Sequence, residues 1–249
     1  VYWMLDYQGN PVVTQKKIYG QAFTIYALAQ YYSASKEKDA LVHAKAIYAL
    51  VEENSYDSDN TGYYESAEQD WSIATDMRLS EKDMNEKKSM NTHLHLLEAY
   101  TNLFKVWPDE MLRIRLQSLL QNFLDHILDP DTLHFRLFFD EAWNSKSQTI
   151  SYGHDIEGSW LLCEAAEILG DDAITKTIHS LAVKMVDATL KEGFDARYAI
   201  YSERSPEGEY LKKTDWWQQA EALVGVVNAF ELTKNKDYLQ WAILIWKFI

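Results

Sequence analysis

Helical periodicity, repeated in pairs, is the feature that most constrains how this chain folds. Apolar residues recur every three or four positions in eight segments, which short connections divide into four successive pairs. In each pair the first segment is more apolar and the second carries more charge, which predicts buried inner helices and outer helices with a solvated face. The predicted helices span residues 18–32, 36–53, 90–104, 109–127, 154–169, 171–190, 215–232 and 236–249.

Short segments between the helix pairs have the alternating apolar pattern of strands. Residues 1–7, 132–139 and 196–202 are of this kind, and residues 8–11 form a turn signal after the first of them. Helix pairs arranged around a ring, with hairpins at one end, describe an all-α (α/α)6 barrel. Such a ring closes with six pairs, so eight helices predict an incomplete ring within a single catalytic domain, residues 1–249. A two-domain helical bundle is the alternative architecture.

Composition and charge exclude several classes of partner. The formal net charge of −14 argues against a nucleic-acid partner and against an anionic membrane surface. No apolar stretch is long enough to cross a bilayer. The single cysteine, Cys163, has no partner for an internal disulfide and fits a reducing compartment, so we expect a cytoplasmic protein. The nine tryptophans and sixteen tyrosines suit a carbohydrate partner, because aromatic rings lie flat on the C–H face of a sugar.

The four inner helices all begin with polar or aromatic residues before they become apolar. If these helices are parallel, their N-terminal ends lie at one mouth of the barrel. Unpaired backbone N–H groups and the positive ends of the helix dipoles at such a mouth favour a developing oxyanion. The polar and aromatic starts are residues 19–21, 91–95, 154–157 and 215–218.

His154 and Glu157 are the candidate acid/base pair. They are three residues apart and therefore share one face of their helix. A carboxylate beside an imidazole fixes the tautomer of the ring and raises its pKa. Such a pair suits a general acid/base that works near neutral pH. An ordinary first turn of a helix with a solvated histidine is the alternative interpretation of the same spacing.

A second candidate group lies on the helix predicted at residues 90–104. Asn91, His95 and Glu98 fall on one face, at positions i, i+4 and i+7. His93 and His95 point in nearly opposite directions, and we expect His95 to face the mouth. The His-x-His spacing also raises the possibility of a metal site, but this spacing suits a strand better than a helix, so we expect no metal and no cofactor.

Aromatic residues mark the starts of two other inner helices. Trp216 and Trp217 point about 100° apart, so one of them can face the mouth while the other packs. Tyr19 is a similar lining candidate on the first inner helix. Glu221 lies one turn after the tryptophans. With Glu157 it could also form the carboxylate pair of an inverting glycosidase, which is the rival enzyme class on this fold.

Five stretches of the chain resemble the N-acylglucosamine 2-epimerase superfamily, and most of all its cellobiose 2-epimerase branch. The resemblance implies an (α/α)6 barrel that converts reducing-end glucose to mannose at C2, without a redox cofactor. The implied substrates are β-1,4-linked disaccharides such as cellobiose, mannobiose or lactose, with N-acylglucosamine as the alternative. The matching stretches are residues 1–4, 19–23, 91–100, 151–157 and 216–221.

The resemblance also implies roles for the candidate residues. In the family a pair of histidines exchanges the C2 proton through an enediolate, and His154 matches one of them. Glu157 matches the carboxylate that supports this histidine. His95 and Asn91 match residues that hold the reducing sugar and assist ring opening.

Further matches concern the substrate. Trp216, Trp217 and Tyr19 match aromatic residues near the sugar, and Glu221 belongs to the same matching stretch as the two tryptophans. Ser80 and Asp83 are similar to contacts for the distal sugar. A family arginine would lie before the first residue and the second catalytic histidine after the last. We therefore expect about three further helices before this chain and one after it, and an inactive 249-residue piece.

Overall fold

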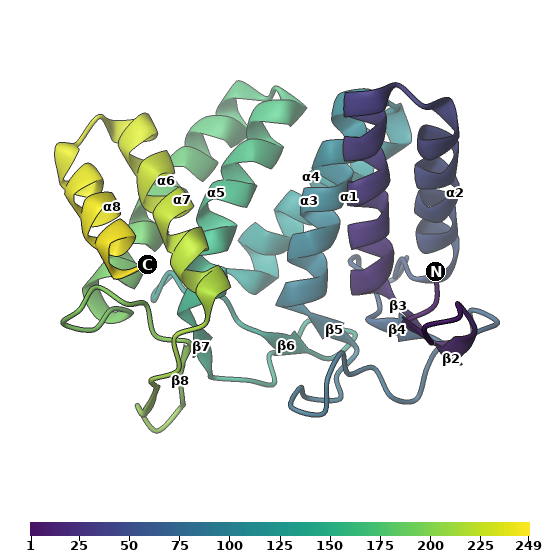
Figure 1. Ribbon diagram of the computed structural model, residues 1–249, viewed down its shortest axis with the longest axis horizontal. Coiled ribbons are helices and arrows are strands. Elements are labelled where there is room, and N and C mark those ends of the chain that lie inside the picture. Colours follow the sequence, from purple (N-terminus) through teal and green to yellow (C-terminus); the bar gives the residue numbers. More distant parts are fainter. The chain divides into compact units, whose positions relative to one another are not determined.

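The structure is a computed structural model that describes residues 1–249 and is mostly helical (Figure 1). All eight predicted helices are confirmed, and the one irregular end is that of α4, which passes into a π-helix, η1 (Phe123–Ile127). The helices are α1 (Ile18–Ser35), α2 (Lys38–Asn54), α3 (Met90–Val106), α4 (Glu110–Asn122), α5 (Tyr152–Leu169), α6 (Asp172–Glu192), α7 (Trp216–Thr233) and α8 (Lys236–Phe248). None of them combines the length and the apolar character needed to cross a membrane.

The chain forms two compact units. The N-terminal unit comprises Val1–Asn122 and Phe138–Lys146, and the C-terminal unit comprises Phe123–Leu137 and Ser147–Ile249. Each unit therefore contains two helix pairs. The single catalytic domain expected from the sequence stays a prediction.

Short strands connect the helix pairs and form small antiparallel sheets within each unit. In the N-terminal unit β1 pairs with β2, β3 with β4, and β5 with β6, while β7, β8 and β9 form one sheet in the C-terminal unit. The strands are β1 (Met4–Leu5), β2 (Pro11–Val13), β3 (Lys16–Lys17), β4 (Ser66–Ala67), β5 (Lys88–Ser89), β6 (Phe138–Phe139), β7 (Ile150–Ser151), β8 (Glu203–Arg204) and β9 (Tyr210–Leu211).

The predicted hairpins have mixed outcomes. The first is confirmed, because Met4 pairs with Val13 and the chain turns between them. Of residues 132–139 only the last two form a strand, β6. Residues 196–202, predicted as a strand or hairpin, form no named strand but belong to a tight hairpin in which Phe194 and Ile200 make an antiparallel bridge. The carboxylate of Asp195 accepts the backbone N–H groups of Arg197 and Ala199 and bends this segment into a turn, so that β8 begins only at Glu203.

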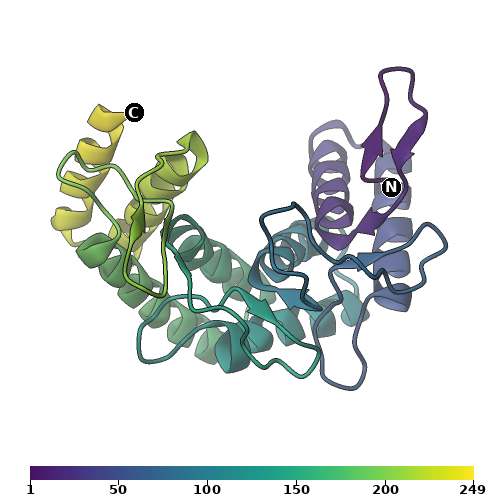
Figure 2. The same cartoon turned by 90° about the horizontal axis from the view of Figure 1, so that it is seen from below.

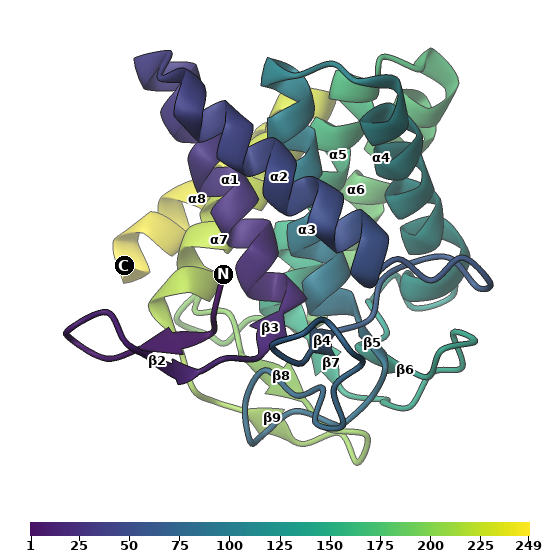
Figure 3. The same ribbon diagram turned by 90° about the vertical axis from the view of Figure 1, so that its right-hand side faces the viewer.

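In the N-terminal unit α1 packs against both α2 and α3, and α3 packs against α4. Figure 3 shows α1 and α3 starting at the end of this unit where β3, β4 and β5 lie. The predicted distinction between buried inner and solvated outer helices holds for α3 but not for α1, which buries only five side chains. Helix α3 is buried along most of its length, whereas α2 buries only a stripe of four side chains. Figure 2 shows the β1–β2 hairpin projecting from the rest of the unit.

A buried lysine holds the loops of the N-terminal unit around β5. The ammonium group of Lys88 donates to the carboxylate of Asp57 (2.8 Å) and to the carbonyl oxygens of Thr61 (2.6 Å) and Glu141 (2.7 Å). These three acceptors satisfy all three N–H donors of a side chain that is fully buried. The lysine thus ties two separate loops, one with Asp57 and Thr61 and one with Glu141, to the strand that leads into α3.

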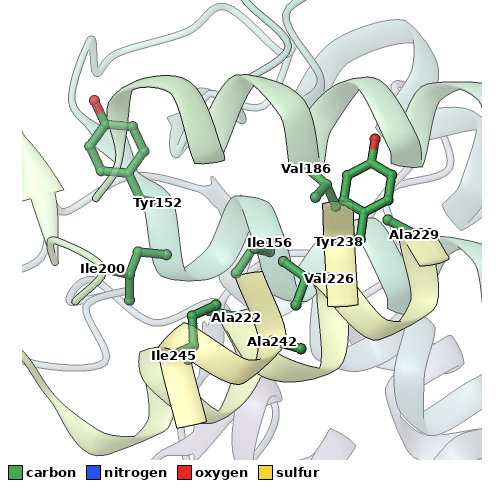
Figure 4. Close-up of a cluster of buried hydrophobic side chains, with 10 residues drawn as sticks. All are labelled: Tyr152, Ile156, Val186, Ile200, Ala222, Val226, Ala229, Tyr238, Ala242 and Ile245. Atoms are coloured by element: carbon green, nitrogen blue, oxygen red, sulfur yellow. The ribbon is translucent and has the colours of Figure 1, made fainter. Parts of the chain in front are cut away.

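In the C-terminal unit α5 packs against α6 and α7, and α7 packs against α8 (Figure 1). Small residues on α7 let the inner helices approach closely. A Cβ atom added at Gly225 would lie only 2.6 Å from Cγ1 of Ile156. Figure 4 shows the resulting core, to which all four helices contribute: Tyr152, Ile156, Val186, Ile200, Ala222, Val226, Ala229, Tyr238, Ala242 and Ile245. Burying each larger apolar side chain contributes about 1.5–3 kcal/mol.

The fourth residue of each inner helix ties that helix to a chain segment that precedes it. In α1 the side-chain amide of Gln21 donates to the carbonyl oxygen of Val1 (2.8 Å). In α7 the amide of Gln219 accepts the N–H of Ile200 (3.0 Å) and donates to its carbonyl oxygen (3.1 Å).

The other two inner helices use a histidine and an aspartate at the same position. In α3, Nε2 of His93 accepts the backbone N–H of Tyr63 (2.9 Å). In α5, Oδ1 of Asp155 accepts the backbone N–H of Phe135 (2.8 Å). All four anchoring side chains are buried. These contacts fix the rotation of each helix about its own axis, and they decide which side chains of the first two turns are turned away from the anchor.

Candidate active site

His95 lies in an aromatic setting in the N-terminal unit. Its Nδ1 donates to the carboxylate of Glu98, 3.0 Å away, because an ionised carboxylate can only accept. The imidazole ring contacts Tyr19 and Phe23 of α1, with ring centroids 5.0 and 4.7 Å apart. The structure therefore brings Tyr19 and His95 together, as neighbours on α1 and α3. Phe23, one turn after Tyr19, completes the cluster.

His93 has a structural role. It is fully buried, its Nδ1 lies 2.6 Å from the carbonyl oxygen of Ser89, and its Nε2 accepts the N–H of Tyr63. One ring nitrogen must therefore carry a proton and the other must not, which fixes a neutral tautomer. Of the two histidines in the His-x-His pair, His95 is the one at the aromatic cluster.

Asn91 and Asp83 line one small cavity in the N-terminal unit, with a volume of about 30 Å³. The side-chain oxygen of Asn91 is buried and makes no hydrogen bond within the protein. The carboxylate of Asp83 accepts the backbone N–H of Ser80 (2.7 Å), which closes a tight turn. Ser80 itself is exposed and shapes this turn rather than the cavity wall.

Glu65 is a buried carboxyl group on the wall of the same cavity, and the sequence patterns did not identify it. It accepts the backbone N–H of Ser89 (2.6 Å) and the hydroxyl of Thr92 (2.7 Å). Burial raises the pKa of Glu65 to about 7, although the hydrogen bonds from Thr92 and Ser89 act in the opposite direction. A titratable group near neutral pH therefore lies at the N-terminus of α3, beside Asn91.

His154 lies in the first turn of α5 in the C-terminal unit. Its Nδ1 is 2.7 Å from the hydroxyl oxygen of Ser151, the residue just before the helix. The ring of Trp217 packs against the imidazole, with centroids 5.0 Å apart and planes inclined by 55°. Ser151 was not among the predicted site residues. Two signals in the sequence point to it: it lies in the stretch 151–157 that resembles the family, and it is a serine at a helix-capping position three residues before the histidine.

The contact between His154 and Trp217 depends on a glycine. A Cβ atom at Gly153 would lie 2.6 Å from Cγ of Gln218 and 2.9 Å from the ring of Trp217. The two neighbouring tryptophans point in different directions, as their spacing predicts. Trp217 packs against α5, whereas Trp216 is 82% exposed.

The two predicted carboxylates of the C-terminal unit lie on α5 and α7. Glu157 is buried one turn after His154. Glu221 accepts a hydrogen bond from the indole N–H of Trp160 (2.8 Å). Trp160 also lines a cavity of about 330 Å³ that lies between α5 and α7. Cys163 lines it, and burial raises the pKa of this thiol to about 11, so it stays protonated at neutral pH.

A charged network adjoins His154 through the next residue, Asp155. The imidazole of His134 lies between two carboxylates, with Nδ1 2.7 Å from Asp155 and Nε2 3.2 Å from Glu192. Both nitrogens can donate only when the ring is an imidazolium. Burial opposes this charge, but the hydrogen bonds and charges of Asp155 and Glu192 outweigh burial and raise the pKa of His134. Arg204 pairs with the other oxygen of Glu192 (3.1 Å).

No group of three or more histidine, cysteine or carboxylate side chains is placed to hold a metal ion. The candidate residues themselves offer imidazole, carboxyl and hydroxyl groups for acid/base chemistry. His154 and His95 each combine a polar partner with an aromatic neighbour. His93 and His134 do so as well, but both are fully engaged in the buried contacts described above.

Comparison with known proteins gives a consistent result. Cellobiose 2-epimerase of Bacteroides fragilis is 44% identical over 250 residues, a match that covers 100% of this chain and 64% of that protein. The enzyme of the same name from Dictyoglomus turgidum is 38% identical and is covered to 63% of its length. The solved cellobiose 2-epimerase of Bacillus thermoamylovorans is 36% identical, with a TM-score of 0.93 over 99% of this chain and 63% of that one.

These matches confirm the all-α, (α/α)6-barrel fold class that the helix pairs predict. The chain spans slightly less than two thirds of the length of the relatives it matches. Residues 1–249, the whole chain, also match the sequence profile of N-acylglucosamine 2-epimerase (GlcNAc 2-epimerase). The chain belongs to the N-acylglucosamine 2-epimerase family.

Proposed function

We propose that the protein carrying this chain is a sugar 2-epimerase that converts the reducing-end glucose of β-1,4-linked disaccharides, with cellobiose as the first candidate, to mannose. The observation that carries the proposal is His154, held at Nδ1 by Ser151 and packed on Trp217. A histidine oriented in this way, in a chain 44% identical to a cellobiose 2-epimerase, is suited to proton exchange at carbon.

The reaction needs a carbon acid. The proton on C2 becomes acidic enough only when the sugar ring opens and C1 becomes an aldehyde. In the proposed mechanism Nε2 of His154 then removes this proton, and the electron pair of the C–H bond passes into an enediolate. Donors near the new oxyanion stabilise it, and general acid/base catalysis contributes about 10²- to 10⁴-fold. Inversion returns a proton from the other face of C2 and so requires a second acid/base besides His154.

In the N-terminal unit the proposed roles concern binding and ring opening. With Nδ1 of His95 committed to Glu98, its Nε2 is suited to exchange a proton with an oxygen of the reducing sugar. The amide of Asn91 has a buried oxygen that makes no hydrogen bond within the protein and is suited to a sugar hydroxyl. Tyr19 offers an aromatic wall, and the turn from Ser80 to Asp83 is the proposed contact for the distal sugar.

In the C-terminal unit the proposed contacts with the sugar are aromatic and acidic. Trp217 positions the imidazole of His154, and the exposed ring of Trp216 is suited to stack on a sugar. Glu157 supports His154 from the next turn of α5. Glu221, held by Trp160, is the proposed acceptor for a sugar hydroxyl.

The test is an NMR experiment with cellobiose in heavy water. We expect the protein that carries this chain to form the glucosyl-mannose disaccharide with deuterium at C2. An inverting glycosidase would cleave cellobiose instead and release glucose. Epimerised product without label at C2 would exclude proton exchange with solvent, and conversion of N-acylglucosamine in preference to cellobiose would move the proposal to the alternative substrate.

A further inference from the structure

We propose that Ser151 is a positioning residue for His154. Its hydroxyl accepts the Nδ1–H of the imidazole and thereby reserves Nε2 for proton exchange. This inference rests on the proposed function and names a group that supports it.

The first step of the argument is the unusual use of a helix cap. Ser151 occupies the N-cap of α5, where a serine oxygen ordinarily accepts a backbone N–H of the first turn. Its side chain makes no such bond. The hydroxyl oxygen lies instead 2.7 Å from Nδ1 of His154, and Ser151 is 97% buried, since only 3% of it is exposed. The buried hydroxyl has thus been diverted from the helix backbone to the imidazole.

The second step is the rigidity of both partners. The backbone of Ser151 is part of β7 and pairs with Glu203 of β8. The imidazole is confined on its other side by the ring of Trp217, which lies close to α5 because residue 153 is a glycine. Neither partner can move far without breaking the sheet or the aromatic contact.

The third step is the chemistry of the hydroxyl. When His154 acts as a base, Nδ1 carries the proton and Nε2 carries the lone pair. After Nε2 takes the C2 proton the ring is an imidazolium, and Nδ1–H still donates to the same hydroxyl oxygen. The hydrogen bond therefore persists through the transfer. A carboxylate at this position would favour the imidazolium by its charge, whereas a neutral hydroxyl leaves His154 able to give the proton back.

The experiment compares Ser151→Ala, Ser151→Thr and Ser159→Ala in the protein that carries this chain. We expect Ser151→Ala to lower kcat for C2 exchange about tenfold or more with little change in KM. Ser151→Thr keeps a hydroxyl and should recover most of the rate. Ser159 lies on the same helix, but its hydroxyl bonds the carbonyl oxygen of Ile156, so Ser159→Ala should leave kcat unchanged.

A second measurement does not depend on activity. The ¹⁵N chemical shifts of the His154 ring should show the proton on Nδ1 in the unsubstituted protein at neutral pH, and Ser151→Ala should change this pattern. A proton on Nε2 in the unsubstituted protein, or an unchanged kcat in folded Ser151→Ala, would overturn the inference. If cellobiose is not epimerised at all, the proposed function fails, and the ring shifts still decide whether Ser151 fixes the tautomer.

Discussion

The first turns of α3 and α5 have the same local structure, but their N-cap serines bond different groups. Each helix follows a two-residue strand and has a serine at its N-cap. In α3 the hydroxyl of Ser89 accepts the backbone N–H of Thr92 (3.1 Å), which stabilises the helix. In α5 the hydroxyl of Ser151 bonds the side chain of the residue at the equivalent position, His154. One cap serves the helix backbone, and the other serves a candidate catalytic group.

The fourth residues show a similar contrast. His93 of α3 and Asp155 of α5 both anchor the backbone of a preceding hairpin. His93 does so as a neutral ring, whereas Asp155 does so with a carboxyl group that also bonds Nδ1 of His134. The comparison teaches that position in the repeat decides where a side chain points, while residue type decides whether the position serves stability or chemistry.

The largest expected effect is on the rate of C2 exchange, and it comes from removing the imidazole of His154 in the first turn of α5. His154→Ala should lower the rate of C2 exchange by about 10³-fold, because the base is lost. Its effect on the melting temperature should be small, since the anchor of α5 is the next residue. The measurement is deuterium incorporation at C2 of cellobiose. His179→Ala is the control, because His179 bonds Glu167 on the surface, and equal losses in both variants would contradict the role of His154.

Substituting the anchoring residues Asp155 of α5 and His93 of α3 should lower the free energy of unfolding by different amounts. Asp155→Ala removes a carboxylate and leaves the N–H of Phe135 and the buried imidazolium of His134 without it, which should lower the free energy of unfolding by about 3–5 kcal/mol. His93→Gln removes a neutral group and keeps an acceptor, so a loss of about 1–3 kcal/mol is expected. Denaturant unfolding measures both. Equal losses would mean that charge at the fourth position is unimportant.

Two buried groups should make the stability depend on pH, Glu65 of the N-terminal unit with a pKa of about 7 and His134 of the C-terminal unit. Because the carboxylates of Asp155 and Glu192 raise the pKa of His134 above its ordinary 6.5, the native state holds this proton more tightly than the unfolded state does. The stabilisation is complete below about pH 6.5 and is lost as the pH rises through the raised pKa. Free energies of unfolding between pH 6 and 9 should therefore fall with pH, and His134→Gln should reduce the slope, while the part that Glu65 contributes around pH 7 stays in place. A slope unchanged by this substitution would refute the assignment.

Sequence patterns predicted the helices well because helix formation depends on local periodicity, and apolar residues recur every three or four positions in all eight segments. They also selected His154 and Trp217, which the structure places in contact. Residues 196–202 form part of a tight hairpin and not an extended strand, because the carboxylate of Asp195 turns the backbone. No local pattern reveals that Glu65 or His134 is buried, since their partners lie 20 or more residues away.

Ser151 was missed for a different reason. A serine before a helix is correctly interpreted as a cap, and only the structure shows that its hydroxyl bonds a side chain three residues on instead of the backbone. The anchoring side chains at the fourth positions of the inner helices were also missed. They are glutamine, histidine or aspartate, so the shared position is recognised only when the first residue of each helix is known.

The smallest expected effect is on stability, and it directly compares the two N-cap serines, Ser89 of α3 and Ser151 of α5. Ser89→Ala should lower the free energy of unfolding by about 1 kcal/mol, because the backbone N–H of Thr92 loses its acceptor. Ser151→Ala removes no bond to the helix backbone but does remove the hydrogen bond to the half-buried His154, so we expect a smaller loss of about 0.5 kcal/mol. The two variants differ by one hydroxyl each at equivalent caps, so chemical denaturation of both isolates what the cap contributes. A larger loss of stability in Ser151→Ala than in Ser89→Ala would show that the hydroxyl of Ser151 acts on the helix after all, and that the two first turns are less different than their hydrogen bonds indicate.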